Sequence, residues 1–313
     1  MNLSESAFVF PGQGSQSPGM LTDYFDSNPS FSSTFDEAQE ILDIDFKNLI
    51  QSGTSEDLAK TQITQPLMLT ANIAVWKAIN IKSSSVGVVT GHSLGEFAAL
   101  VAAEVLSFED ALNLVFIRAS LMQQAVPEGK GGIAAIIGLS IEEVTAICLE
   151  IVENEDQIVS PANINSPIQT VISGTAKAVE LAMRACKKAG AKRALPLAMS
   201  VPSHCELMQP AANKFKTELD SVYFNDPKIK VFQNYSANYS SNPEEIKSNL
   251  VRQICNPVRW VETIENIRSN NIHNFIECGP GKVLSGLVKR IVDNSEIISL
   301  DSHQTFKEIF IKL

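Results

Sequence analysis

A serine flanked by glycines is the residue of this sequence best suited to covalent chemistry. The segment Gly91-His92-Ser93-Leu94-Gly95 matches the pattern G-x-S-x-G, with a β-branched run before it and a helical pattern after it. In a nucleophile elbow the glycines let strand and helix approach closely, and the serine hydroxyl is exposed on a strained turn. The Leu94 N–H and the N-terminus of the following helix favour a developing oxyanion. A buried serine in a glycine-rich strand–helix turn would show the same pattern.

A nucleophilic serine needs a base, and the sequence holds four histidines. His92 is adjacent to Ser93, and we expect its side chain to point elsewhere on the elbow. His204 lies in a short polar loop, whereas His273 and His303 lie near the C-terminus, where an α/β-hydrolase keeps its base. The residues alone leave the choice among these last three histidines open.

Short β-branched runs alternate with helical patterns along the chain, which indicates an α/β fold. The strands predicted outside the middle of the chain are Ala7–Phe10, Val86–Thr90, Lys230–Phe232 and Asn274–Glu277. The predicted helices are Pro66–Ile79 with proline in its first turn, one after the elbow, one started by Ser107 with Asp110, one from about Glu206, one opened by Asn242-Pro243-Glu244-Glu245, and two closing helices.

From about Gly131 the order of predicted elements becomes β-α-β-β-α-β, the ferredoxin-like plan. The predicted strands are Ile133–Ile137, Ile158–Asn163, Gln169–Ser173 and Arg193–Leu197, with a loop at Ile164–Pro167, and the helices are one capped by Ser140 with Glu143 and one at Thr175–Ala189. We therefore predict an α/β-hydrolase-like catalytic domain with a parallel sheet, formed by residues 1–128 and 199–313. Residues 129–198 are predicted to form an inserted ferredoxin-like (βαββαβ) subdomain.

Composition limits the class of partner and the compartment. The 313 residues are 44% hydrophobic and 19% charged, which is ordinary for a folded protein. The net charge of −10 argues against nucleic acid as a partner, because phosphate binding needs a basic surface. The five cysteines form no CxxC pair, and no export signal or membrane-spanning apolar run is visible. We expect neither a disulfide framework nor a metal site, and a cytoplasmic location.

Five motifs in one order and spacing give the chain a resemblance to a known family. They are Phe10-Pro11-Gly12-Gln13-Gly14-Ser15-Gln16, Gly91-His92-Ser93-Leu94-Gly95-Glu96, Val201-Pro202-Ser203-His204, Gln253 before Asn256-Pro257-Val258-Arg259-Trp260, and Gly279-Pro280-Gly281-Lys282-Val283-Leu284. Over nearly its whole length the chain resembles the acyltransferase family of fatty acid and polyketide synthesis. The resemblance implies transfer of a malonyl group from coenzyme A to the phosphopantetheine thiol of acyl carrier protein. It also implies a ping-pong course through a malonyl-serine, which supplies extender units for fatty acid synthesis.

The same resemblance implies the catalytic roles. Ser93 resembles the acylated nucleophile, His204 resembles its base, and Gln253 matches the residue that orients the histidine. Gln13 and Leu94 resemble the donors of the oxyanion hole through their backbone N–H groups. The implied arrangement is a dyad with a neutral partner in place of an acidic triad.

Substrate binding is implied at Arg118, Asn163 and Gln13. Arg118 matches the arginine that holds the malonyl carboxylate, and Asn163 lies where the family has an asparagine lining the substrate cleft. A guanidinium presents parallel donors to a carboxylate and stays charged at any relevant pH, so the chemistry suits the role. An arginine in a salt bridge on a helix surface is the alternative interpretation.

The implied partners are malonyl-CoA and acyl carrier protein, with no cofactor, and we expect a monomer. Carrier proteins are acidic, so we expect a local basic face for docking. Two groups of cations could provide it: Lys187, Lys188, Lys192 and Arg193, or Lys282, Lys289 and Arg290. Either group could instead be an ordinary solvated helix surface.

Two other functions remain open on the sequence. An esterase or thioesterase would use the same serine with water as acceptor. A scaffold without activity would be expected to lack the serine or the histidine, and both are present.

Overall fold

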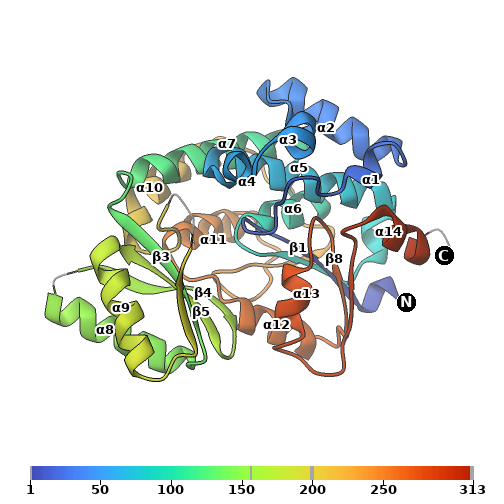
Figure 1. Cartoon of the computed structure of the whole chain (residues 1–313). Helices are drawn as coiled ribbons and strands as arrows, with labels where there is room; N and C mark the ends of the chain where they lie inside the picture. The colour runs from blue at the N-terminus through green and yellow to red at the C-terminus, as the bar shows by residue number, and fades with distance from the viewer. Residues whose placement is uncertain (1, 156, 198–200, 311–313) are drawn as a thin grey trace.

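The chain folds around two β-sheets, one parallel and one antiparallel (Figure 1). The computed structural model describes residues 2–155, 157–197 and 201–310. The parallel sheet has five strands in the order β7-β2-β1-β8-β9. These strands are β7 (Lys230–Phe232), β2 (Val88–Gly91), β1 (Ser6–Phe10), β8 (Asn274–Glu277) and β9 (Glu296–Ser299).

Helices cover both faces of the parallel sheet, and the alternation of side chains along β1 shows why. Phe8 and Phe10 join one apolar cluster, whereas Ala7 and Val9 join a second cluster on the opposite face. Successive residues of a strand point to opposite faces, so a strand buried on both sides must be apolar throughout. We call this sheet with its helices the large unit.

The helices of the large unit come from both ends of the chain. They are α1 (Thr22–Phe25), α2 (Pro29–Leu42), α3 (Phe46–Ser52), α4 (Ser55–Ala59), α5 (Thr61–Ile79), α6 (Gly95–Ala102), α7 (Phe108–Ala125), α10 (Gln209–Asp220), α11 (Pro243–Cys255), α12 (Trp260–Ser269), α13 (Val283–Val288) and α14 (His303–Phe310). Three short 3-10 helices are η1 (Leu3–Glu5), η2 (Ser83–Ser85) and η3 (Glu206–Met208). The described part of the chain contains no helix that is both long enough and apolar enough to cross a membrane.

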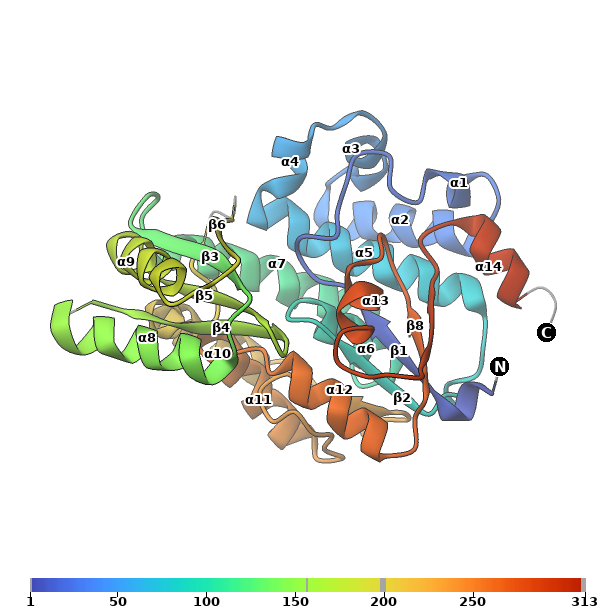
Figure 2. The ribbon, with the colours of Figure 1, turned by 60° about the horizontal axis from the view of Figure 1, so that its bottom comes forward.

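The antiparallel sheet has four strands in the order β4-β5-β3-β6. They are β3 (Gly131–Ile137), β4 (Val159–Ser166), β5 (Gln169–Thr175) and β6 (Arg193–Pro196), with α8 (Ile141–Glu155) after β3 and α9 (Ala176–Lys188) after β5. Both helices cover the face of this sheet that is turned away from the large unit (Figure 2). This small unit has the predicted β-α-β-β-α-β order, and the predicted fold class is confirmed.

The antiparallel sheet begins at Gly131, just after the predicted first boundary between residues 128 and 129. The predicted second boundary, between residues 198 and 199, lies outside the described residues. We therefore keep the division into residues 1–128 with 199–313, and 129–198, as a proposal.

Three predicted element boundaries were wrong. Helix α5 begins at Thr61, so Pro66 lies inside it, in the second turn. Strand β4 continues through most of the predicted loop 164–167, because Ile164 and Ser166 still pair with Thr170 and Gln169 of β5. Between the two closing helices lies strand β9, which pairs with β8 and extends the sheet.

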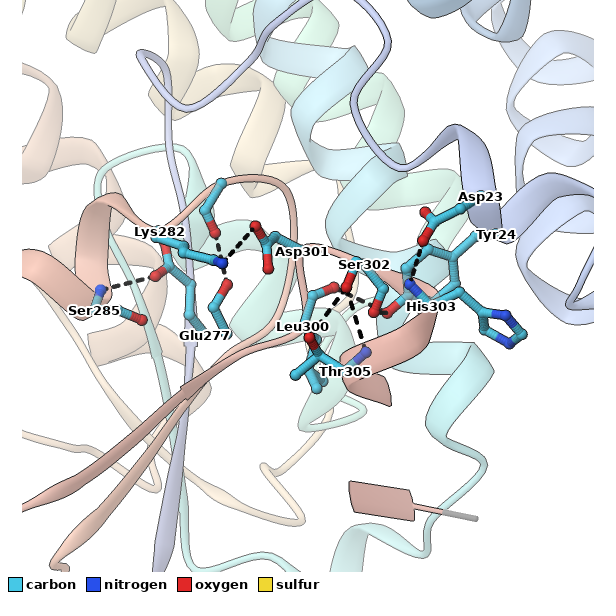
Figure 3. A network of polar contacts seen from close by, with 12 residues as sticks. Asp23, Tyr24, Glu277, Lys282, Ser285, Leu300, Asp301, Ser302, His303 and Thr305 are labelled. Carbon is cyan, nitrogen blue, oxygen red and sulfur yellow. Dashed lines mark hydrogen bonds and ion pairs between the residues drawn. The ribbon is translucent and has the colours of Figure 1, made fainter. Parts of the chain in front are cut away.

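Helix α13 is held by a buried carboxylate at the end of β8. Glu277 accepts hydrogen bonds from the N–H groups of Leu284 at 3.0 Å and Ser285 at 2.7 Å (Figure 3). Lys282 forms an ion pair with Asp301 at 3.4 Å and so joins the same turn to the segment before α14. The predicted glycine-rich turn 279–282 is thus held by Glu277 at the start of α13 and by Asp301 at Lys282.

Strand β2, helix α6 and the end of β1 meet without space for side chains. A β-carbon placed on Gly95 would lie 2.0 Å from the Phe10 carbonyl oxygen, and one on Gly91 would lie 2.0 Å from Gly95. Atoms cannot approach that closely, so backbone must move if either glycine gains a side chain.

Replacement of Gly95 with alanine should therefore destabilise the fold by about 1–3 kcal/mol. Gly286→Ala is the matched control, because no atom outside its own helix and chain neighbours lies within 4 Å of the added carbon. Alanine is the better helix former, so the control should be neutral or slightly stabilising. Urea unfolding of both variants measures the difference, and equal stabilities would show that the elbow has room to adapt.

Candidate active site

A pocket of about 360 Å³ lies between the two units and takes its lining from both. The small unit contributes Ala135, Asn163, Asn165, Gln169 and Val171. Most of the catalytic and substrate-binding residues predicted from the sequence line this pocket: Gln13, Ser93, Leu94, Arg118, Asn163 and His204. Gln253 does not line it. The fold therefore gathers residues from distant parts of the chain into one place.

Ser93 lies on the turn between β2 and α6 in a strained backbone conformation. Its φ of 51° is in the left-handed region, which costs a residue with a β-carbon about 1–2 kcal/mol. The side chain of Asn234 holds this turn from behind. Its Oδ1 accepts from the Ser93 N–H at 2.6 Å, and its Nδ2 donates to the Gly91 carbonyl at 2.7 Å.

His204 is the histidine that contacts the serine. Its Nε2 lies 2.7 Å from Ser93 Oγ, and its Nδ1 lies 2.7 Å from the backbone carbonyl of Gln253. A carbonyl only accepts, so Nδ1 carries the proton and Nε2 is free to accept from the serine hydroxyl. This is the arrangement of a base ready to take the Ser93 proton.

The environment of His204 keeps its imidazole neutral. Burial disfavours the charged form, and the nearby positive charge of Arg118 adds to that effect, so the pKa falls to about 3. Only the carbonyl of Gln253 opposes this shift. Among the described residues the ring bonds to the Ser93 hydroxyl and the Gln253 carbonyl and to no carboxylate.

Gln253 contacts His204 through its main chain, and its side chain serves another contact. The Gln253 Oε1 accepts from Arg118 Nη2 at 3.0 Å. The Gln253 Nε2 donates to the Ser93 carbonyl at 3.1 Å and to the Glu96 carboxylate at 2.8 Å. The predicted contact between Gln253 and the histidine is thus made by the backbone carbonyl, and the orienting role of Gln253 stays a prediction.

Arg118 is buried, with 1% of its surface exposed, and its guanidinium lies beside the serine. Nη1 donates to Gln65 Oε1 at 2.6 Å, and Nη2 donates to Ser93 Oγ at 3.2 Å as well as to Gln253. Its Nε is buried without a hydrogen-bond partner among the described residues. The interpretation as a helix-surface arginine in a salt bridge is therefore wrong. A buried cation in a pocket wall, whose acceptors among the described residues are neutral groups, is suited to bind an anionic group.

The two predicted oxyanion donors lie at the pocket with their backbone N–H groups unused. Within the described residues, neither the Gln13 N–H nor the Leu94 N–H donates a hydrogen bond. Leu94 directly follows the serine and precedes α6, whose N-terminus favours negative charge. Both groups are thus available to an oxygen bound in the pocket.

Asn163 lies on β4 and lines the pocket. Its neighbour Asn165 also lines the pocket and was not identified from the sequence. The Oδ1 of Asn165 accepts from His92 Nε2 at 2.8 Å, and the His92 ring packs on Trp260. His92 therefore points away from the serine hydroxyl.

The other two histidines lie outside the pocket. His273 is exposed and contacts Arg268, whereas His303 is buried beside Tyr24 and Phe306 (Figure 3). Neither occupies the position that a base for Ser93 requires.

The two groups of cations differ in their relation to the pocket. In the first group, Lys187 donates to the carbonyls of Ala191 at 2.9 Å and Lys192 at 3.1 Å, in the segment that follows α9. In the second group, Arg290 Nη1 donates at 2.8 Å to Gln169, a residue of the pocket wall. The second group therefore lies at the edge of the pocket.

Besides Asn165, three further buried polar residues of the site were not identified from the sequence: Gln65, Glu96 and Asn234. Glu96 directly follows the G-x-S-x-G pattern, and a charged residue in an otherwise apolar helix was a usable signal. Gln65 and Asn234 come from unrelated segments, and their residue types alone point to no role. Within the described ranges, no group of three or more His, Cys, Asp or Glu side chains is placed to hold a metal ion.

Comparison with known families and proteins gives matches over nearly the whole chain. Residues 7–303 match the family described as acyl transferase domain. A malonyl CoA-acyl carrier protein transacylase from Salmonella typhimurium is 48% identical over 93% of this chain and 94% of its own length. The protein of the same name from Haemophilus influenzae is 46% identical over 98% of both chains.

Solved structures give the same result at the level of the fold. An acyl carrier protein S-malonyltransferase from Vibrio cholerae superposes with a TM-score of 0.93 at 45% identity, covering 98% of this chain and all of its own. A malonyl-transacylase in complex with a type II PKS acyl carrier protein gives a TM-score of 0.95 at 46% identity, covering 99% and 100% of the two chains.

The low pKa of His204 predicts a pH dependence of stability. The folded protein keeps this histidine neutral down to about pH 3, whereas the unfolded chain binds a proton below the ordinary pKa of 6.5. The contribution of His204 to the free energy of unfolding is therefore fully present above pH 6.5 and decreases as the pH falls. The decrease is about 2 kcal/mol at pH 5.

Urea unfolding at pH 8, 6.5 and 5 tests this, with His204→Gln as the comparison. Between pH 8 and pH 5 the free energy of unfolding of the variant should decrease by about 2 kcal/mol less than that of the unaltered protein. Contributions from the other histidines cancel because both proteins contain them. Parallel curves for the two proteins would contradict a neutral buried imidazole.

Proposed function

Because the chain belongs to the acyl transferase family, we propose that it transfers a malonyl group from coenzyme A to the phosphopantetheine thiol of an acyl carrier protein. The names of relatives at 46–48% identity support this reaction, which supplies extender units for fatty acid synthesis. The observation that carries the proposal is a buried arginine with unused donors beside a serine–histidine dyad.

The first half-reaction acylates the enzyme. His204 Nε2 takes the Ser93 proton while Ser93 Oγ attacks the thioester carbonyl of malonyl-CoA. The oxygen of the tetrahedral intermediate accepts from the N–H groups of Gln13 and Leu94. The C–S bond then breaks, and coenzyme A leaves as a thiol with the proton from His204.

The second half-reaction reverses these steps with a different thiol. His204 takes the proton of the phosphopantetheine thiol, and the sulfur attacks the malonyl-serine ester. The C–O bond to Ser93 breaks, and His204 returns the proton to the serine oxygen. The course is ping-pong, and the proposed chemistry uses no cofactor, since the coenzyme A thioester is a substrate.

Arg118 is proposed to bind the free carboxylate of the malonyl group. Its position 3.2 Å from Ser93 Oγ would place the thioester carbonyl between the serine and the oxyanion donors. Asn163 and Gln13 would line the path of the acyl group. An acyl group without a carboxylate would leave the buried guanidinium without an anionic partner.

Water as the acceptor would make the same dyad a hydrolase. The family match and the relatives' names favour a thiol acceptor. An α/β-hydrolase also keeps its catalytic histidine near the C-terminus, whereas His204 lies about a hundred residues before the end of this chain. We therefore propose transfer, not hydrolysis.

For the carrier protein we propose docking at Lys282, Lys289 and Arg290. This group flanks pocket residues of α13 and of the β4–β5 hairpin, so a partner bound there could extend its thiol into the pocket. Lys187 instead donates to two carbonyls of the segment after α9, and no residue of its group lines the pocket, which makes that group the weaker candidate. Acidic carrier proteins would be attracted to a basic rim.

Ser93 should carry the acyl group. After brief incubation with labelled malonyl-CoA, intact mass should show one malonyl adduct on the peptide that contains Ser93. Addition of phosphopantetheinylated carrier protein should move the label to the carrier, and Ser93→Ala should form no adduct. An adduct on another residue, or release of free malonate in place of transfer, would contradict the proposal.

Arg118→Ala should change the selectivity between acyl donors. Loss of a buried charged contact should lower kcat/KM for malonyl transfer by roughly 30-fold or more, and acetyl transfer should fall much less or rise. The comparison requires kcat/KM for malonyl-CoA and acetyl-CoA with both enzymes. Arg184→Ala, which removes a surface ion pair with Glu180, is the control and should change neither value. Equal losses for the two donors would assign Arg118 to the fold or to the shared coenzyme portion.

A further inference from the structure

A carboxylate with no step in the proposed reaction lies directly behind the active site. Glu96 is in the first turn of α6, and none of its surface is exposed. No ion pair joins it to a cation in the described part of the chain. Burying a charge without an ion-pair partner is costly, so its hydrogen bonds must compensate. Such a residue calls for an explanation in the site that it supports.

Three N–H donors from two separate segments converge on this carboxylate. Oε1 accepts from Gln233 Nε2 at 3.0 Å, and Oε2 accepts from the Asn234 N–H at 2.9 Å and from Gln253 Nε2 at 2.8 Å. The first two donors follow strand β7, and the third comes from α11. The contact with the Asn234 backbone N–H fixes Oε2 as an acceptor, and the two glutamine side chains likewise direct the nitrogen end of their amides at the carboxylate.

This orientation decides which end of the Gln253 amide faces the guanidinium. With its nitrogen directed at Glu96, Gln253 must present its oxygen on the other side, where Arg118 Nη2 donates to it at 3.0 Å. A reversed amide would put its NH₂ group against the Arg118 Nη2 donor and its oxygen against the Glu96 carboxylate, so both of these hydrogen bonds would be lost. The hydrogen bonds thus run in one direction, from Arg118 through Gln253 to Glu96.

We propose that Glu96 is a positioning residue for acyl selectivity, which acts on Arg118 through the Gln253 amide. This inference rests on the proposed function, because it assumes that Arg118 binds the acyl carboxylate. Gln253 holds the guanidinium beside Ser93 through a neutral acceptor, so no direct ion pair with Glu96 neutralises the positive charge. An acidic acyl group can then claim the remaining donors.

The test is the ratio of kcat/KM for malonyl-CoA to that for acetyl-CoA. Glu96→Gln has the same shape but introduces a donor where only acceptors fit, so the ratio should fall about tenfold. Gln253→Met removes the amide and keeps the carbonyl that orients His204, and it should lower the ratio similarly. If Glu96 acts through Gln253, the double variant should show no further fall beyond Gln253→Met.

Glu277→Gln is the matched control, since Glu277 is also a fully buried carboxylate held by N–H donors. It should lower stability in urea and leave the ratio unchanged. An unchanged or increased ratio in Glu96→Gln, or additive losses in the double variant, would overturn the inference. If Glu96→Gln does not fold, Gln253→Met alone must still lower the ratio, and failure to do so overturns it. Absence of malonyl transfer by the unaltered protein would instead overturn the proposed function.

Discussion

The close contact of α6 with β1 and β2 sets the position of everything that reacts. Gly91 and Gly95 have no side chains, so the backbones of β2, α6 and β1 can approach closely and the chain can turn within a few residues. This turn places Ser93 in the pocket wall. Ser93 and His204 both have left-handed backbone, with φ of 51° and 61°. Such conformations persist only where surrounding bonds over-determine them. Asn234 supplies those bonds for Ser93, and the bond from the His204 N–H to the Ile254 carbonyl, at 3.1 Å, holds the histidine.

Charge is the second constraint on this site. Arg118 is buried, yet its acceptors are the neutral groups of Gln65, Ser93 and Gln253. Burial lowers its pKa to about 10, which leaves it charged at neutral pH. The nearest compensation comes from Glu96, which is linked to it only through the Gln253 amide. A direct ion pair would have satisfied the guanidinium and removed its capacity for another anion.

Features encoded in neighbouring residues could be predicted from the sequence, and features made by distant segments could not. The bounds of β7 and β8, the N-caps at Ser107, Ser140 and Asn242, and the ferredoxin-like order follow from local pattern and capping chemistry. Strand β9 is short and gains its stability from pairing with β8, which no local pattern reveals. The local G-x-S-x-G pattern indicated Ser93, and the family resemblance added His204 and Arg118 as candidates. It could not reveal that Gln253 uses its carbonyl for one partner and its amide for another.

The backbone of Gln253 bonds to the catalytic histidine and its side chain bonds to Arg118, and this separation affects how sites of this kind can diverge. Every amino acid has a backbone carbonyl, so any residue at position 253 that preserves the helix keeps the bond to His204. The side chain is then free to drift under selection without loss of the catalytic base. A lineage could exchange the acyl groups that it accepts by substitution at this position and at Arg118, while its ability to acylate a serine is inherited unchanged.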